Sequence, residues 1–280
     1  MTSGKFVTTV GYEKRFSPAL QFTDREAFIR FMNQEQPLRP ANIANIVGIN
    51  QGKRPLTMED PVAEALSPAA ANELIQNGAL VIDCRSSAAF GAGHIPGAYN
   101  MQLASSEFEQ RVGCVTPLDL PLILVTNSAD EAQRAIYLLA FLGLDQRVKG
   151  FVEGGMEAWA QAGLPVSKLE QMSVQTLYQK LQQNGHQVLD VRETSEWDDG
   201  HVENAHYMNF KVIRNRIGEL TLTPEDHVAV VCGTGKRSST AGSILLMNGY
   251  EHVYNVIGGM TAWRDAGYPM INADGVVCNV

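Results

Sequence analysis

The sequence predicts an α/β protein made of two copies of one domain, each a mainly parallel sheet flanked by helices, preceded by a short N-terminal arm. Two observations support this prediction. Residues 80–98 recur as residues 187–205, and residues 154–165 recur in the same order as residues 258–269. Within each copy, short apolar runs alternate with helical patterns, which is typical of parallel sheets covered by helices.

The repeat rests on matched residues. In the first block five residues recur at a constant spacing: Asp83, Arg85, Gly93, His94 and Ala98 match Asp190, Arg192, Gly200, His201 and Ala205. The second block begins with Gly-Gly-Met-x-Ala-Trp in both copies. We therefore place the first domain at residues 62–168 and the second at residues 169–280, after an arm formed by residues 1–61.

In each copy, a continuous apolar run predicts a strand that is buried on both faces. These runs are residues 122–125 and residues 228–231, and each is followed by a polar turn and a helical stretch, at 131–142 and 238–248. Ligands of open parallel sheets bind at the carboxyl ends of the strands. The turn after Val231 is therefore where chemistry is expected.

Composition and charge exclude some classes of function. The chain has 280 residues, a net charge of −8 and a pI of about 5.3, which argues against a general nucleic-acid binder. No apolar run approaches the roughly 18 residues needed to span a bilayer, and the first residues lack the apolar core of a secretory signal. We expect a cytoplasmic protein that binds neither nucleic acid nor membranes.

Four cysteines are present: Cys84, Cys114, Cys232 and Cys278. No pair has the Cys-x-x-Cys spacing, so neither a metal site nor a disulfide framework is expected. Only Cys232 is followed by glycines and two adjacent basic residues. It is therefore the candidate nucleophile, and the other three are expected to have no catalytic role.

The elements Asp-x-Arg…Gly-His-Ile-Pro-Gly-Ala and Gly-Gly-Met-x-Ala-Trp resemble the rhodanese (sulfurtransferase) family over about 62–168 and 172–273. In that family, the nucleophile is the first residue of the turn after the buried strand. The resemblance thus implies that Cys232 is the nucleophile of the second domain. Thr126 stands at the same place in the first copy, and two acids replace the glycines and basic residues of the turn. The first domain therefore resembles an inactive rhodanese domain, a scaffold for the second.

The turn after Cys232 is suited to binding an anionic sulfur. It contains Gly233, Thr234, Gly235, Lys236, Arg237 and Ser238. The glycines allow close approach of the backbone, while the following helix N-terminus and the two basic residues favour a thiolate and an anionic donor. We expect double displacement through a Cys232 persulfide, from thiosulfate or a low-molecular-weight persulfide to a thiol or cyanide, without a cofactor.

The resemblance also implies that Arg192 helps to hold the donor. A structural ion pair with Asp190 is the alternative. His94 and His201 occur in both copies, including the copy without a nucleophile, so both are expected to be structural. The tryptophans of the two Gly-Gly-Met-x-Ala-Trp elements are expected in the core.

In the arm, residues 24–32 predict an amphipathic helix with Thr23 as its N-cap. Residues 8–15, together with 37–40 and Asn50, resemble the end of a metallo-β-lactamase-fold domain, which precedes tandem rhodanese domains in some persulfide dioxygenase fusion proteins. The His-x-His-x-Asp-His metal motif of that family is absent, so no metal site is expected. A persulfide dioxygenase or another sulfur-pathway protein is an expected partner. A plain arm packing on the domain pair is the alternative.

Two further functions compete with sulfur transfer. Phosphatases with a related loop use Cys-x5-Arg, whereas here only four residues separate Cys232 from Arg237. The shorter loop favours the smaller sulfur substrate. A non-catalytic persulfide carrier, which would dock on a partner, is the other alternative and shares every residue of the proposed site.

Overall fold

The computed structural model describes residues 7–33, 42–53, 59–183 and 185–278. The chain divides into two compact units, residues 1–39 and residues 40–280. Segment 37–40, which the resemblance to a metallo-β-lactamase fold invokes, lies outside the described residues. Across the described ranges, no helix has both the length and the apolar character needed to cross a membrane.

The first unit consists of short helices. They are α1 (Val10–Phe16), the 3-10 helix η1 (Pro18–Gln21) and α2 (Arg25–Met32). The predicted N-cap of the last helix, Thr23, is wrong by one residue. The N-cap is Asp24, because its backbone is extended and its carboxylate accepts the Ala27 N–H at 2.6 Å, satisfying a free amide of the first turn.

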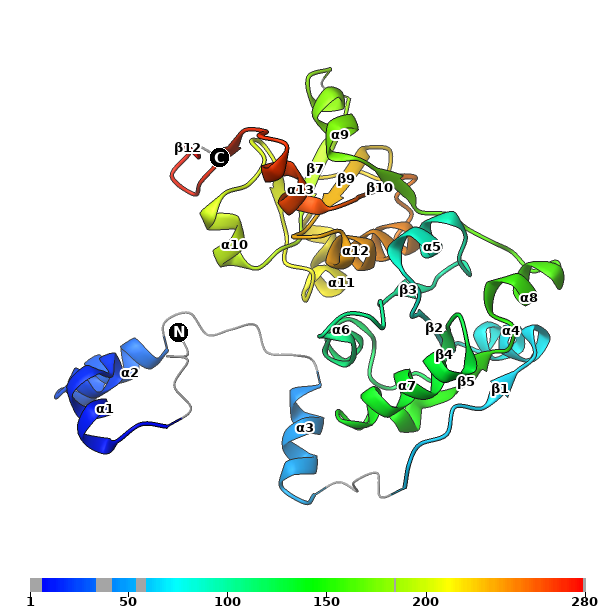
Figure 1. Ribbon diagram of the computed structural model, residues 1–280, viewed down its shortest axis with the longest axis horizontal. Helices are drawn as coiled ribbons and strands as arrows, with labels where there is room; N and C mark the ends of the chain where they lie inside the picture. The colour runs from blue at the N-terminus through cyan, green and yellow to red at the C-terminus, as the bar shows by residue number, and fades with distance from the viewer. Residues whose placement is uncertain (1–6, 34–41, 54–58, 184, 279–280) are drawn as a thin grey trace. The chain divides into compact units, whose positions relative to one another are not determined.

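The first sheet of the second unit has five strands in the order β1-β5-β4-β2-β3, and every pairing is parallel (Figure 1). Its strands are β1 (Ala65–Leu66), β2 (Leu80–Asp83), β3 (Tyr99–Asn100), β4 (Leu122–Val125) and β5 (Val148–Val152). The helices of this part are α3 (Ile43–Asn50), α4 (Pro68–Gln76), α5 (Ser87–Ala92), α6 (Phe108–Val115), α7 (Ala129–Ala140), η2 (Asp145–Arg147) and α8 (Gly155–Gln161).

The second sheet repeats this arrangement, with five parallel strands in the order β6-β10-β9-β7-β8. Its strands are β6 (Glu170–Met172), β7 (Gln187–Asp190), β8 (His206–Tyr207), β9 (His227–Val231) and β10 (His252–Val256). The helices are α9 (Val174–Leu181), α10 (Thr194–Asp199), α11 (Ile213–Arg216), η3 (Ile217–Glu219), α12 (Lys236–Met247) and α13 (Gly259–Asp265), and an antiparallel pair, β11 (Met270–Ile271) and β12 (Val277–Cys278), follows. The identical strand order confirms the predicted pair of α/β domains with parallel sheets.

Both central strands are buried on both faces, as their apolar runs predict. All residues of β4 are 0% exposed, and residues 228–231 of β9 are 1% exposed or less. Trp159 and Trp263 are also in the core, where their indole N–H groups donate to the carbonyls of Pro165 and Pro269. These prolines follow α8 and α13, so each indole anchors the segment that leaves its helix.

The two repeated histidines have equivalent structural contacts. His94 Nδ1 lies 2.9 Å from the Phe90 carbonyl oxygen, and its ring stacks on Phe90. His201 makes the same two contacts with Trp197. Because the contacts recur in the copy without a cysteine nucleophile, they support the predicted structural role.

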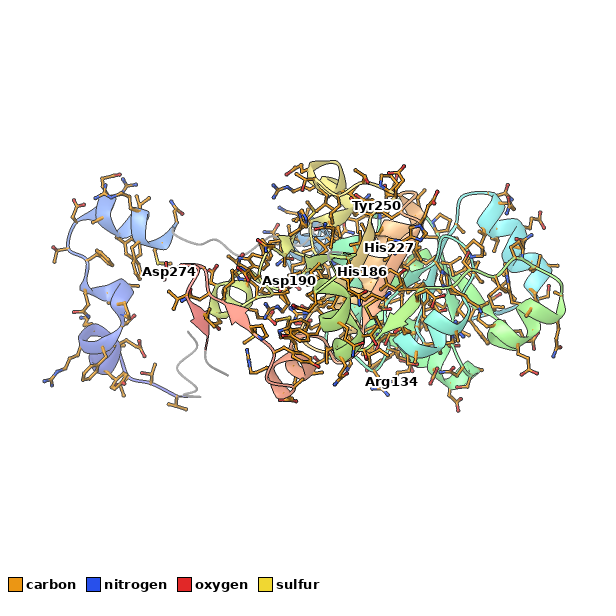
Figure 2. All side chains as sticks on the ribbon, turned by 90° about the horizontal axis from the view of Figure 1, so that it is seen from above. Arg134, His186, Asp190, His227, Tyr250 and Asp274 are labelled. Carbon is orange, nitrogen blue, oxygen red and sulfur yellow. The ribbon has the colours of Figure 1, made fainter. Side chains whose placement is uncertain are left out.

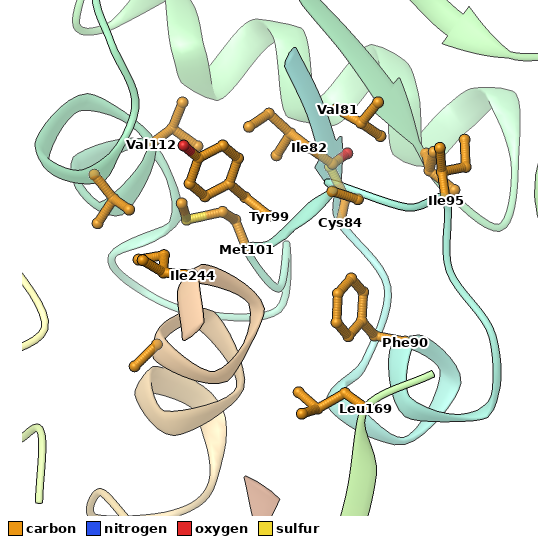
Figure 3. Packing of buried hydrophobic residues seen from close by; sticks show 14 of the residues in the cluster. Val81, Ile82, Cys84, Phe90, Ile95, Tyr99, Met101, Val112, Leu169 and Ile244 are labelled. Atoms are coloured by element: carbon orange, nitrogen blue, oxygen red, sulfur yellow. The ribbon is translucent and has the colours of Figure 1, made fainter. Parts of the chain in front are cut away.

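The two domains share one apolar cluster, in which helix α12 of the second domain packs beside strand β3 of the first. Figure 3 shows Ile244 of α12 on the same side as Tyr99 and Met101, and Leu169 close to Phe90. Strand β3 is an edge strand of its sheet, and α12 covers that edge. Covering an edge keeps its backbone groups from pairing with a strand of another chain.

Asn100, at the end of β3, is the polar centre of this contact and is fully buried. Its Oδ1 accepts the hydroxyl of Ser239 at 2.6 Å, its backbone carbonyl accepts the hydroxyl of Thr240 at 2.6 Å, and its N–H donates to Ser243 Oγ at 3.3 Å. The side-chain amide donates to the carbonyls of Asp83 and Arg85. One residue of the first domain thus fastens the helix that begins at the Cys232 loop.

We expect Asn100→Ala to lower the free energy of unfolding by about 3 kcal/mol, because it removes the hydrogen-bond partner of the buried Ser239 hydroxyl and of the Arg85 carbonyl, and one of two donors to the Asp83 carbonyl. Chemical denaturation with and without the substitution measures this change. Asn77→Ala, at the exposed end of α4, is the control and should be nearly neutral. Equal stability of the two variants would contradict the role given to Asn100.

Candidate active site

Cys232 lies directly after the central strand β9 and before helix α12. Its side chain is 1% exposed. The Gly235 N–H donates to its Sγ at 3.1 Å, and Ser238 Oγ lies 3.4 Å from the same sulfur. The sulfur therefore sits at the carboxyl end of a parallel strand and at the positive end of a helix, where an anion is stabilised.

The loop needs glycine at position 235. Gly235 is the N-cap of α12 and has a φ of +92°, a conformation that side chains with a Cβ rarely adopt. An added Cβ would also lie 3.2 Å from the carbonyl oxygen of Val256. Glycine here lets the loop turn sharply enough for an N–H to reach the sulfur.

The Gly-Gly-Met element holds the other side of the loop. The Met260 N–H donates to the Cys232 carbonyl at 2.7 Å, and the Thr261 N–H donates to the Gly233 carbonyl at 3.0 Å. Gly259 has a φ of +53°, and a Cβ added there would collide with the Cys232 carbonyl oxygen. This element is therefore part of the support of the nucleophile, a role that the sequence alone did not reveal.

Ser238 lies beneath the sulfur and is fully buried. Its hydroxyl donates to Asn255 Oδ1 at 2.6 Å, and the Asn255 amide in turn donates to Gln171 at 2.9 Å. Because the Ser238 hydroxyl donates its hydrogen bond to Asn255, Ser238 Oγ can act only as an acceptor toward the Cys232 thiol. Substrate binding by Ser238 stays a prediction; the contacts that the structure shows are with Cys232 and Asn255.

Arg237 is held by a carboxylate. Its Nη1 and Nη2 donate to Glu196 at 2.5 and 2.7 Å. Burial lowers the pKa of Arg237, but its bonds to Glu196 and its proximity to Cys232 outweigh burial and raise this pKa above its usual value. Burial raises the pKa of Glu196, but the hydrogen bonds and the positive charge of Arg237 lower this pKa by more, so that it lies below its usual value. The charge of Arg237 near the sulfur is thus largely neutralised.

The other predicted loop residues differ in exposure. Lys236 is half-buried at the first position of α12, Thr234 is exposed, and Gly233 lies against Arg237, since an added Cβ would be 3.1 Å from Nη2. The structure therefore brings four of the predicted loop residues around Cys232: Gly233, Gly235, Arg237 and Ser238. Lys236 begins the helix that points at the sulfur.

Arg192 is engaged in the structural ion pair that was the alternative to donor binding. Its Nε and Nη2 bond to the Asp190 carboxylate (Asp190 is labelled in Figure 2), and Nη2 also donates to the Gly200 carbonyl at 2.7 Å. Arg85 makes the same bonds to Asp83 and Gly93 in the first domain. The pair is equally intact in the first domain, where Thr126 stands in place of the cysteine, so this geometry favours the structural role, and donor binding by Arg192 stays a prediction.

The corresponding loop of the first domain is closed by its own carboxylate. Thr126, in place of the cysteine, donates its hydroxyl to the Ser128 carbonyl at 2.8 Å. The backbone N–H and the side-chain amide of Asn127 both donate to Glu131 at 2.9 Å. The backbone amide that corresponds to that of Gly233 is thus occupied by a carboxylate of the same loop, which agrees with the prediction that this domain is inactive.

Two other cysteines have buried thiols. Cys84 directly follows strand β2, and its thiol faces the Ile82 carbonyl at 3.6 Å. Burial, and secondarily the charges of Asp83 and Glu131, raise the pKa of the Cys84 thiol well above its usual value. Cys84 is thus held as a neutral thiol, unlike a nucleophile.

The sequence missed Glu196, Asn255 and Gly259. Glu196 offered a signal, because Ala89 is its counterpart in the first copy, and the acid occurs only where Arg237 occurs. Asn255 and Gly259 lie in other segments of the chain, and no local pattern links them to Cys232.

The chain belongs to the rhodanese-like domain family, because the model of that family matches residues 67–162 and 173–266, more than half of the chain. Thiosulfate sulfurtransferase 18 of Arabidopsis thaliana is 37% identical over 103 residues, which cover 32% of this chain and 75% of the plant protein. Thiosulfate sulfurtransferase GlpE of Shewanella oneidensis is 29% identical over 101 residues, covering 36% of this chain and 98% of the bacterial protein.

Among solved structures, a rhodanese-related protein of Thermoplasma volcanium is similar to this chain. It has 29% sequence identity and a TM-score of 0.34, and the match covers 36% of this chain and 97% of that protein. The matches to the two thiosulfate sulfurtransferases each span about a third of this chain, the length of one of its two domains.

Proposed function

We propose that the second domain is a sulfurtransferase that moves sulfane sulfur from thiosulfate or a low-molecular-weight persulfide to a thiol or cyanide. The observation that carries this proposal is the environment of the Cys232 sulfur, which accepts the Gly235 N–H at 3.1 Å at the start of α12. A thiolate or a persulfide at this position is stabilised by the amide and by the helix terminus. The thiosulfate sulfurtransferases among the relatives support the same reaction.

The reaction proceeds in two displacements. In the first, the Cys232 thiolate attacks the outer sulfur of thiosulfate, a new S–S bond forms, and sulfite leaves with the electron pair of the broken S–S bond. In the second, a thiolate or cyanide attacks the outer sulfur of the Cys232 persulfide, and Cys232 leaves as a thiolate. The sulfane sulfur keeps its oxidation state throughout, so neither an oxidant nor a reductant is consumed.

Loop length separates this proposal from a phosphatase function. Four residues lie between Cys232 and Arg237, and Glu196 occupies both terminal nitrogens of that arginine. A phosphatase of this type would need those nitrogens for a tetrahedral phosphate. The loop therefore favours the smaller outer sulfur as the reacting group.

Initial rates of thiocyanate formation, measured while thiosulfate and cyanide are varied together, test the proposed enzyme. Double displacement predicts parallel lines in double-reciprocal plots. A single sulfur loaded per chain, without continued turnover with cyanide or glutathione, would instead identify the persulfide carrier. Hydrolysis of a phosphate ester without sulfur transfer would identify a phosphatase.

We also propose that the arm, residues 1–61, is a remnant of a metallo-β-lactamase-fold domain and that a persulfide dioxygenase is a partner. The support is the resemblance of residues 8–15 to the end of such a domain in fusion proteins. Co-elution of the chain with a purified persulfide dioxygenase in size-exclusion chromatography tests the partnership. Separate elution at micromolar concentration would contradict it.

A further inference from the structure

One arginine of the first domain is buried without adequate partners. Arg111 lies on α6, and its side chain is 6% exposed. Its Nη2 is 3.5 Å from the carboxylate of Glu107, a side chain that is itself 53% exposed. Its Nε and Nη1 have no hydrogen-bond partner among the residues that the structure describes. Burial of a cation with unsatisfied donors is destabilising, so this arrangement requires an explanation.

The guanidinium of Arg111 lies beside the second domain. Its Cζ is 5.9 Å from the centroid of the Phe210 ring, and the Phe210 N–H donates to the Val191 carbonyl at 3.1 Å. Val191 follows the last residue of β7, the strand that pairs with β9 just before Cys232. Arg111 therefore reaches the carboxyl edge of the second sheet, where parallel sheets bind their ligands.

The electrostatics of Arg111 agree with this position. Burial lowers the pKa of Arg111, Glu107 and Cys232 raise it, and Arg237 lowers it. Cys232 and Arg237 of the second domain thus act through space on an arginine of the first. A guanidinium stays charged at neutral pH even when its pKa is lowered.

Arg111 is a more available cation than Arg237. Glu196 holds both terminal nitrogens of Arg237 at 2.5 and 2.7 Å, whereas the single ion pair of Arg111 is long and partly exposed to solvent. An oxyanion between α6 and Cys232 would accept hydrogen bonds from the free donors of Arg111. It would also relieve the repulsion between the two guanidinium groups.

We infer that Arg111, in the inactive domain, is a donor-binding residue of the Cys232 site and binds the oxyanion end of the sulfur donor. That group is the sulfonate of thiosulfate or a carboxylate of an organic persulfide. The inference rests on the proposed sulfur transfer and extends it, because the first domain then supplies a residue to the substrate site as well as a scaffold.

The first test does not depend on sulfur transfer. It compares the rates at which iodoacetate and iodoacetamide alkylate Cys232, followed by peptide mass mapping. A nearby cation accelerates only the anionic reagent. Arg111→Met should lower the iodoacetate-to-iodoacetamide rate ratio about tenfold, the loss expected for one charge-assisted contact. Arg134→Met removes a charge from an exposed site on α7 of the same domain and should leave the ratio unchanged.

The second test measures sulfur transfer with two donors. Arg111→Met should raise the KM for thiosulfate about tenfold or more. Arg111→Lys should keep the alkylation ratio but still raise this KM, because lysine retains the charge and loses the two-pronged geometry. A matching rise in KM for glutathione persulfide would show that Arg111 also binds organic donors, and a rise for thiosulfate alone would restrict it to the sulfonate.

The outcomes separate the inference from the proposed function. An alkylation ratio that does not change in Arg111→Met, while the variant keeps the wild-type melting temperature, overturns the inference whatever the donor kinetics show. A lowered ratio in a protein that forms no persulfide from either donor supports the placement of Arg111 and overturns sulfur transfer.

Discussion

Cys232→Ser is expected to abolish sulfur transfer, with a loss of at least about a thousandfold in kcat. Serine has nearly the same size as cysteine and keeps the hydrogen bond from Gly235, but its oxygen cannot form a persulfide. The rate of thiocyanate formation from thiosulfate and cyanide measures the loss. Because only the reacting atom changes, the melting temperature should stay close to that of the wild type.

The other cysteines provide the controls for this substitution. Cys84→Ser, Cys114→Ser and Cys278→Ser should each retain most of the activity. At position 84, the serine hydroxyl can donate to the Ile82 carbonyl that the thiol already faces. Full activity in Cys232→Ser, or its loss in one of the other three variants, would mean that the nucleophile has been assigned to the wrong residue.

Gly259→Ala is expected to lower kcat/KM at least about a hundredfold, because a small misplacement of a reacting group has an effect of this size. The new Cβ would overlap the carbonyl oxygen of Cys232, which the Met260 N–H binds at 2.7 Å. The loop must then move, and the amide of Gly235 can no longer be aimed at the sulfur. Steady-state kinetics together with a thermal melt separate this effect from unfolding.

Two other glycines with positive φ, Gly267 and Gly155, provide the controls for this prediction. Gly267 has a φ of +69° and open space around it, so Gly267→Ala adds only backbone strain of about 1–2 kcal/mol. Gly155 occupies the position of Gly259 in the first domain, where a Cβ would lie 2.8 Å from the Thr126 carbonyl oxygen. Both variants should keep kcat/KM near the wild-type value. A comparable loss in Gly267→Ala would point to strain alone rather than to displacement of Cys232.

Much of the fold was predictable because it depends on local patterns. A run such as residues 122–125, followed by a turn and a helical stretch, is typical of a strand buried on both faces, and its repetition at 228–231 predicts a second sheet of the same kind. Thr126 and Cys232 stand at equivalent points of the two copies, so the sequence also predicts that the first copy lacks a cysteine nucleophile. These conclusions need only the order and type of neighbouring residues.

The support of the site was not predictable in the same way, because its contacts join distant segments. Arg237 pairs with Glu196, and Cys232 is supported by the element that contains Gly259, while Asn100 binds the helix that starts at the loop. Sequence spacing contains no information on which of these segments meet in space. Arg192 shows what a resemblance to a family leaves open. The resemblance implies donor binding, whereas the side chain forms a buried ion pair with Asp190.

The two copies have therefore diverged in complementary ways. The first has Thr126 in place of the cysteine and a loop whose Asn127 amide binds Glu131, while it provides Asn100 to the helix that begins at the second loop. The second keeps Cys232 and depends on the first for the packing of α12. A pair of this kind is expected to unfold as one unit, since the shared apolar cluster contains residues of both domains.

The central claim is that Cys232 carries the sulfur between donor and acceptor, and its most direct test is the mass of the protein after incubation with thiosulfate. We expect a gain of one sulfur atom per chain, located on the peptide that contains Cys232 and removed by a reducing agent or by cyanide. A protein whose Cys232 thiol alkylates normally, yet gains no sulfur from thiosulfate or from glutathione persulfide, would contradict the claim.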